Sequence, residues 1–153
     1  MKKATVRRCV FAELSTDKNF AALTAEYAAE SHLAGLPAPK AHLASYHALE
    51  AAGVMRTICA YVGTELVGFA IVLITIMPHY SAPVATMESF FVAARRRESG
   101  AGLALRRAVE RISKAHGARG LLISAAVGSR LEKLLKKSRA FQESHHIFFK
   151  ALT

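Results

Sequence analysis

The sequence predicts an α/β (α+β) fold in which a central mixed, mostly antiparallel sheet is flanked by helices. Its 153 residues fit one domain, expected over residues 1–153, since domains usually take roughly 100–200 residues. No internal repeat, low-complexity tract or linker divides the chain. Segments with strand and helix periodicity follow one another in the order β-α-α-β-β-β-α-β-α-β, which is typical of one layered domain.

The first third predicts a strand and two helices. Residues 5–11 are rich in Val and Phe and alternate weakly, as a strand does. A helix then follows residues 15–17, a cluster of possible N-cap side chains, and closes at Gly35. The second helix is expected to begin near Pro39, because proline suits the first helical position, and to end at Gly53.

Three strands are expected next. Met55–Val62 and Glu65–Met77 are separated by only Gly63 and Thr64, a spacing that predicts a hairpin. The second of these strands is nearly all apolar, which indicates burial on both faces. A loop over residues 78–83 leads to a third strand, residues 85–92.

The last third predicts two helices and two strands. Apolar residues recur at helical spacing between Gly102 and Gly117, opposite a basic face. A short buried strand is expected over residues 121–126, and Ser129 can cap a helix over residues 130–138. Residues 144–152 alternate and are expected to form a final strand.

The composition favours an anionic ligand. Lys and Arg number 21 against 11 acidic residues, a formal net charge of +10. Such a field attracts anions such as the phosphates of a cofactor, nucleic acid, acidic substrates or an acidic membrane surface, and it disfavours polycations such as polyamines and aminoglycosides as substrates.

The sequence predicts a cytoplasmic protein with reduced thiols. Cys9 and Cys59 show no partner spacing for a metal or redox pair and are expected to be free. The basic start of the chain lacks the apolar stretch of a signal peptide. The most apolar run, residues 67–77, is too short for a bilayer, which takes about 20 residues.

The segment from Val92 to Gly102 carries the clearest chemical signal. It joins a predicted strand to a predicted helix, and Gly100 and Gly102 alternate at the helix start. Glycine lets the backbone approach a ligand closely, and the free N–H groups of a helical first turn bind phosphates. Arg97, three residues before Gly100, adds a charge-assisted donor.

This segment resembles the GNAT superfamily of acyl-CoA-dependent N-acetyltransferases. That family places a strand valine five residues before an R/Q-x-x-G-x-G/A signature, and Val92 stands five residues before Arg97. The resemblance covers nearly the whole chain. It implies that the backbones of Phe90 and Val92 pair with the pantetheine arm of acetyl-CoA. It also implies that the pyrophosphate is held by Arg97, Glu98, Ser99, Gly100, Ala101 and Gly102.

Two departures from the family pattern stand out. Glu98 brings a negative charge to the phosphate loop, so its side chain should point outward to Arg95 or to solvent. Families of this type often carry an Asn and, seven residues later, a Tyr that protonates the leaving thiolate. By that alignment Ser129 and Lys136 occupy these two cofactor-site positions.

Glu88 is the predicted general base. It lies in an apolar strand, four residues before Val92, and strict alternation places it on the same face as Phe90 and Val92. Neighbouring apolar strands should then partly desolvate its carboxylate. Many GNAT-like enzymes carry a carboxylate at this position and use it through a water molecule. A plain ion pair with a neighbouring Lys or Arg is the structural alternative.

Other polar residues are candidates for binding the acceptor. His79 and Tyr80 fall in the loop before the Glu88 strand, and His145 begins the last predicted strand. Tyr27 and Tyr46 are most simply core residues of the first two helices. The histidines lack metal-ligand spacing, so no metal site is expected.

The predicted activity is acetyl transfer from acetyl-CoA to a primary amine of a small molecule or protein, by direct attack in a ternary complex. One alternative is a catalytically degenerate module that binds acyl-CoA. Another is an acyltransferase for an amine linked to nucleic acid, suggested by the basic faces of the last two helices. The apolar final strand also predicts a homodimer, the commonest soluble oligomer.

Overall fold

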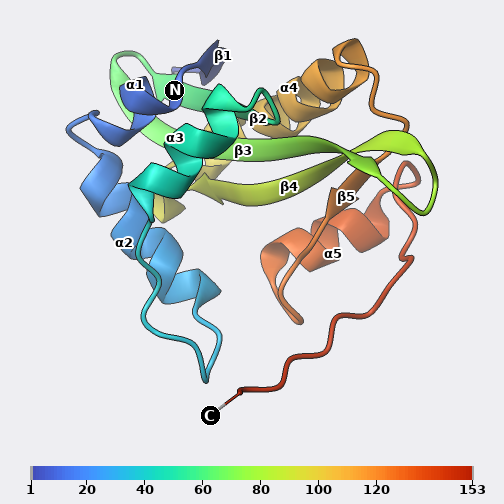
Figure 1. Ribbon diagram of the computed structural model, residues 1–153. Helices are drawn as coiled ribbons and strands as arrows, with labels where there is room; N and C mark the ends of the chain where they lie inside the picture. The colour runs from blue at the N-terminus through green and yellow to red at the C-terminus, as the bar shows by residue number, and fades with distance from the viewer. Residues whose placement is uncertain (1, 153) are drawn as a thin grey trace.

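A computed structural model describes residues 2–152 of the predicted domain, and the two terminal residues lie outside this range. One five-stranded sheet crosses the molecule in the order β1-β2-β3-β4-β5 (Figure 1). Its strands are β1 (Thr5–Cys9), β2 (Met55–Val62), β3 (Glu65–Met77), β4 (Ala82–Val92) and β5 (Leu121–Ile123). The first four pair antiparallel, and only β4 and β5 run parallel, which confirms the predicted mixed, mostly antiparallel sheet.

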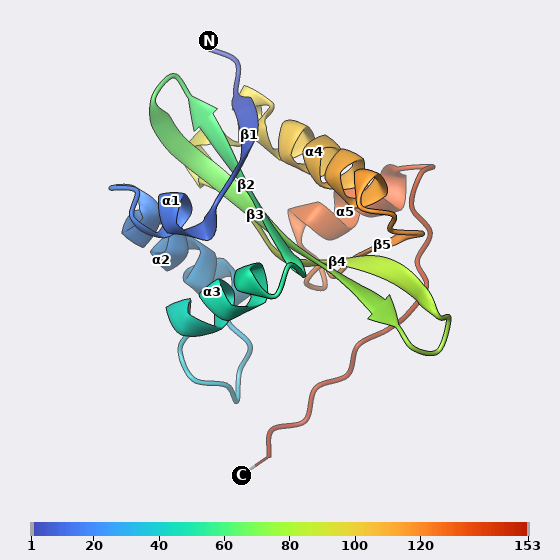
Figure 2. The same cartoon turned by 45° about the horizontal axis from the view of Figure 1, so that its top comes forward.

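Helices cover both faces of this sheet. They are α1 (Phe11–Ser15), α2 (Phe20–Ser31), α3 (Leu43–Ala51), α4 (Ala101–Ala115) and α5 (Arg130–Lys137), with a 3₁₀ turn, η1 (Ala94–Ser99), before α4. Helices α1 to α3 lie on one face and α4 and α5 on the other (Figure 2). No helix within residues 2–152 is long and apolar enough to cross a membrane.

Each face of the sheet has its own hydrophobic core. The predicted apolar stripe of α4 is confirmed, with Leu105 and Val109 fully buried against the sheet. Strand β3 serves both cores, as its nearly continuous apolar sequence predicted: Val67 packs on the α4 side, and Phe69 packs on the α1–α3 side. The sheet therefore separates two halves of the molecule that pack independently of each other.

Gly68 sets how closely β3 and β4 approach. A Cβ at this position would lie 2.6 Å from the carbonyl oxygen of Phe91 and 3.0 Å from Val92. Only glycine avoids these contacts, so the position of the last residues of β4 depends on it.

The prediction of free, reduced thiols is wrong. Cys9 and Cys59 form a disulfide that joins β1 to β2, with the two Cα atoms 6.5 Å apart. Antiparallel pairing of these strands places Cys9 opposite Thr57, two residues from Cys59. The 50 residues that separate the cysteines in sequence hide this neighbourhood, which only the strand pairing creates.

The final predicted strand is also wrong. Residues 144–152 form no strand within the described chain, although the backbone is extended and crosses toward the loop after α2 (Figure 1). Ile147 and Phe148 are 80% and 91% exposed. Alternation alone does not make a strand, because a strand needs a neighbour for its backbone hydrogen bonds.

Several element boundaries also differ from prediction. The first strand ends at Cys9, because the unpredicted helix α1 begins at Phe11. Helix α3 starts at Leu43, so the residues from Pro39 form a loop instead of a first turn. Strand β5 stops at Ile123, and α5 has the predicted cap: Ser129 Oγ accepts a hydrogen bond from the Glu132 N–H at 3.1 Å.

Candidate active site

A β-bulge defines the centre of the site. Ile71 of β3 pairs with Ser89, whereas the next residue, Val72, pairs with Met87. Glu88 is thus an extra residue in β4 with no partner in β3. Such a bulge bends the strand and redirects side chains.

The bulge overturns the predicted face of Glu88. Glu88 and Ser89 both line a cavity on the α1–α3 side of the sheet. Phe90 and Val92 instead pack into the core on the α4 side. Strict alternation fails here because one inserted residue shifts the side-chain pattern of the rest of the strand.

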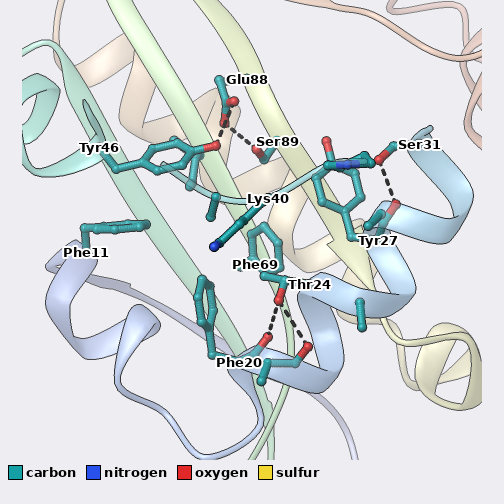
Figure 3. Close-up of a pocket in the computed structure, with 16 residues that line it drawn as sticks. Phe11, Phe20, Thr24, Tyr27, Ser31, Lys40, Tyr46, Phe69, Glu88 and Ser89 are labelled. Atoms are coloured by element: carbon teal, nitrogen blue, oxygen red, sulfur yellow. Dashed lines mark hydrogen bonds between the residues drawn. The ribbon is translucent and has the colours of Figure 1, made fainter. Parts of the chain in front are cut away.

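The cavity beside Glu88 has a volume of about 520 Å³. Strands β3 and β4 form its floor, and residues of α1, α2, α3 and the loop before α3 form its walls (Figure 3). Five of the lining residues are aromatic: Phe11, Phe20, Tyr27, Tyr46 and Phe69. This size is usual for a small-molecule site.

The Glu88 carboxylate accepts two hydrogen bonds from neighbouring hydroxyls. Tyr46 Oη donates to it at 3.0 Å, and Ser89 Oγ donates to its second oxygen (Figure 3). Glu88 is exposed to solvent in the cavity, so the expected partial desolvation is wrong. It forms no ion pair with any residue in the described chain, which leaves its charge available to a ligand.

Tyr27 and Tyr46 are not simply core residues, as the sequence suggested. Both are half-buried and line the cavity. Burial raises the pKa of Tyr46 to about 12, and the neighbouring Glu88 charge adds to this effect. Burial likewise raises the pKa of Tyr27. Both phenols therefore stay protonated at neutral pH and can donate hydrogen bonds into the cavity.

One edge of β4 is open beyond the bulge. Strand β5 pairs only with Ala85–Met87 and then ends. Val92 faces Gly68, and the flanking Ala93 N–H donates to the Val67 carbonyl at 2.9 Å. This pattern marks Val92 and Gly68 as a non-hydrogen-bonded pair, so the N–H and C=O groups of Val92 point away from β3. Phe90, two residues earlier, has the same orientation.

The segment predicted from its glycines to bind phosphate comes next in the chain. Gly100 has φ +83° and is the N-cap of α4, and a Cβ there would point into open space. Ala101 and Gly102 begin the helix, whose first turn leaves N–H groups without intrahelical acceptors. Ser99 Oγ accepts from the Ala101 N–H at 3.3 Å, and the side chain of Glu98 is exposed, pointing to solvent as expected.

Arg97 is engaged by protein groups. Its Nε donates to the Val92 carbonyl at 3.1 Å, and its guanidinium contacts both carboxylate oxygens of Glu30 at 2.6 and 2.7 Å. Helix α2 makes a second contact to this loop, since the Ala94 N–H donates to Glu26 at 3.2 Å. Two carboxylates of α2, the helix that lines the cavity, thus hold the start of the phosphate loop.

The two remaining cofactor-site candidates are engaged by neighbouring residues of α5. Ser129 caps α5, and Lys136 pairs on the same helix with Glu132 at 2.9 Å. The carboxylate raises the pKa of Lys136, so this side chain stays a cation.

The predicted acceptor-binding residues also lie outside the cavity. The rings of His79 and Tyr80 meet edge to face in the turn between β3 and β4, with their centroids 4.9 Å apart. His145 lies in the exposed C-terminal segment, where its Nδ1 is 2.9 Å from Ser144 Oγ. None of the three is among the residues that line the cavity. Within residues 2–152 no cluster of His, Cys, Asp and Glu could hold a metal ion.

Comparison with solved structures supports the fold. An aminoglycoside acetyltransferase from an uncultured soil metagenomic sample superposes with a TM-score of 0.74 at 15% identity, over 98% of this chain and 97% of that chain. The aminoglycoside N-acetyltransferase AAC(6')-Iy in complex with CoA gives 0.72 at 21% identity, over 98% and 95%. Ribosomal-protein-alanine N-acetyltransferase from Brucella melitensis biovar Abortus 2308 gives 0.67 at 19% identity, over 96% and 99%.

Sequence comparison gives the family. No curated protein sequence matches the chain. The family model described as acetyltransferase (GNAT) family matches residues 13–141, a span that includes every residue lining the cavity except Phe11, the open edge of β4 and the segment from Arg97 to Gly102. The chain therefore belongs to the GNAT acetyltransferase family and is an acyl-CoA-dependent N-acetyltransferase.

Proposed function

We propose that the protein transfers an acetyl group from acetyl-CoA to a primary amine bound in the cavity, with Glu88 as general base. One observation carries this proposal. The bulge places the only carboxylate that lines the cavity at the point where β4 loses its β5 neighbour. An acceptor in the cavity and a cofactor on the open edge would therefore meet at Glu88.

The residues near the open edge fit acetyl-CoA. The backbone groups of Phe90 and Val92 offer donors and acceptors to the pantetheine amides, as an added strand would. The segment from Arg97 to Gly102, with its open space above Gly100, suits the pyrophosphate. When bound, acetyl-CoA supplies an activated acetyl group as a thioester. The Arg97 guanidinium can contact phosphate only if the Glu30 carboxylate is displaced.

Glu88 is placed to take a proton from the acceptor. An amine must lose its ammonium proton before it can attack a carbonyl, and an unpaired carboxylate in the cavity can accept that proton directly or through water. Tyr46 and Ser89 fix the orientation of the carboxylate through their hydrogen bonds. Tyr27 and Tyr46 line the cavity as protonated phenols and could supply the proton for the leaving thiolate, whereas Lys136 is held on α5 by Glu132.

Replacement of Glu88 tests this role. Glu88→Gln keeps the shape of the side chain and removes its basicity, so turnover should fall by roughly 10²–10⁴-fold, or less if water relays the proton. CoA affinity should stay unchanged. The loss should shrink at high pH, where the amine deprotonates without help. Glu143→Gln, in the exposed C-terminal segment, is the matched control.

The assay is release of free CoA thiol with an amine acceptor, recorded as a pH–rate profile. Equal turnover of Glu88→Gln and the parent at neutral pH would remove Glu88 from the mechanism. CoA binding without transfer to any amine would instead support the acyl-CoA-binding module. For an amine linked to nucleic acid, tRNA binding should weaken steeply with salt. Two of the basic side chains behind that alternative, Arg106 and Lys136, already pair with carboxylates on their own helices.

A further inference from the structure

The wall of the cavity is mainly apolar. Its aromatic rings come from four separate elements, α1, α2, α3 and β3, and alanines fill the face of α2 between them. Ala21, Ala25 and Ala28 recur at helical spacing on that face. Small residues opposite aromatic rings leave room for a ligand and offer it little except apolar surface.

The aliphatic hydroxyl groups of α2 that line the cavity offer it no free hydrogen-bond donor. Thr24 Oγ1 donates to the Phe20 carbonyl at 2.9 Å, and Ser31 Oγ donates to the Tyr27 carbonyl at 2.7 Å (Figure 3). Both donors are therefore used within their own helix. On the opposite wall, Tyr46 and Ser89 donate to Glu88. A ligand rich in hydroxyl groups would find few free donors for its oxygen atoms here.

Two side chains of opposite charge line the cavity. Glu88 is its single carboxylate and Lys40 its single cation, contributed by the loop before α3. Lys40 projects among the aromatic side chains in the close-up (Figure 3), and it forms no ion pair with any residue in the described range. One ammonium group can pair with Glu88, and a second ammonium would meet Lys40 instead of an acid.

We infer that the acceptor is a small monoamine with an aromatic or branched apolar body and no second cation. This inference rests on the proposed function and narrows its substrate. The ammonium pairs with Glu88, and the aromatic faces can stabilise the cation further. The apolar body lies against Phe11, Phe20 and Phe69. Aminoglycosides and polyamines carry several ammonium groups, and each one left unpaired in the cavity would be unfavourable.

An amine panel tests the substrate class. Phenethylamine, ethylamine, spermidine, kanamycin and a lysine-containing peptide are compared by kcat/KM with acetyl-CoA. The kcat/KM for phenethylamine should exceed that for ethylamine by at least about tenfold, because ethylamine lacks the ring, whose contacts contribute more binding energy than one methylene does. It should also exceed the kcat/KM for the polycations. Preference for spermidine, kanamycin or the peptide would overturn the inference and leave the proposed function intact.

A binding measurement separates the two failures. Phenethylamine binding to the CoA-loaded protein is followed by calorimetry, independently of turnover. Binding without transfer would support the substrate class and contradict the proposed catalysis. Transfer to other amines, without phenethylamine binding, would contradict the substrate class alone.

Two pairs of variants locate the acceptor. Ala28→Leu fills the cavity and should weaken phenethylamine binding by about tenfold or more, while Ala29→Leu, on the exposed side of α2, should not. Lys40→Glu should raise kcat/KM for the diamine cadaverine relative to phenethylamine, because it supplies a second carboxylate. Lys18→Glu makes the same charge change outside the cavity and should leave that ratio unchanged. Equal effects within either pair would overturn the inference.

Discussion

Replacing Gly100 by alanine would test the phosphate loop directly. Gly100 has φ +83°, a left-handed conformation that costs a residue with a Cβ about 1–2 kcal/mol. Gly117, which follows the same helix, has φ +79°, and neither position has an atom within 4 Å of an added Cβ. The two substitutions therefore carry nearly the same conformational strain, at opposite ends of α4.

We expect the two variants to have similar stability, but we expect only Gly100→Ala to bind CoA more weakly than the parent. Each should lower the free energy of unfolding by about 1–2 kcal/mol, a Tm loss of roughly 2–8 °C for a domain of this size. In Gly100→Ala the added methyl group also enters the open space above Gly100, where we propose that the pyrophosphate binds. Loss of one charge-assisted hydrogen bond to phosphate, worth about 1.5–3 kcal/mol, would weaken CoA binding about 10–150-fold.

Isothermal titration with CoA measures the affinity, and thermal unfolding checks the shared strain. Gly117→Ala should bind CoA like the parent. If both variants bind CoA as tightly as the parent, the pyrophosphate does not lie against Gly100 and the site assignment fails. A loss in both would mean that strain in α4, and not phosphate contact, controls the affinity.

Four further substitutions or measurements follow from the same structure. Glu30→Gln removes the carboxylate that occupies Arg97, so CoA affinity should rise; a fall by titration would mean that Glu30 orients Arg97 for binding. Gly68→Ala forces β4 away from β3 and should lower unfolding free energy in urea by about 1–3 kcal/mol, which an unchanged midpoint would refute. Burial raises the pKa of Tyr46 from about 10 in the unfolded chain to about 12 in the folded chain, so deprotonation of the unfolded chain opposes folding as the pH rises from about 10 to 12. Over that range the Tm of the parent should fall more than the Tm of Tyr46→Phe, and parallel plots of Tm against pH for the two proteins would contradict the shift. The apolar C-terminal segment should be covered in a homodimer, so light scattering should give twice 16.5 kDa, and Phe148→Glu should give the monomer; a monomeric parent at all concentrations would exclude this.

Features set by local chemistry were predictable from the sequence. The β2–β3 hairpin has the predicted bounds, because a Gly-Thr turn separates two apolar runs. The turn between β4 and α4 also has the predicted form, with a glycine, Gly100, in a left-handed conformation at the start of an amphipathic helix. Its binding of phosphate stays a prediction.

Features that depend on strand pairing were not predictable in the same way. The bulge at Glu88 cannot be seen in the sequence, since it appears only in the pairing of β4 with β3, where Ile71 faces Ser89 and Val72 faces Met87. The Cys9–Cys59 disulfide needs β1 and β2 to be neighbours. Tyr27 and Tyr46 have the spacing of core residues, and only the assembled helices show that they face a cavity. A signal was nevertheless present, because the alanines of α2 lie on the same side as its aromatic residues.

The two independent cores have a consequence for how acceptor specificity can change. The proposed cofactor contacts come from the β4 edge and the start of α4, whereas the walls of the proposed acceptor cavity come mostly from α1, α2 and α3 on the opposite face. Substitutions within the acceptor walls need not disturb packing of α4 against the sheet. A library restricted to cavity-facing positions of α2 and α3 would therefore sample new acceptors while the cofactor half of the enzyme stays intact. Glu30 and Glu26 are the positions of α2 to hold constant in such a library, because they alone connect that helix by hydrogen bonds to the phosphate loop in the described chain.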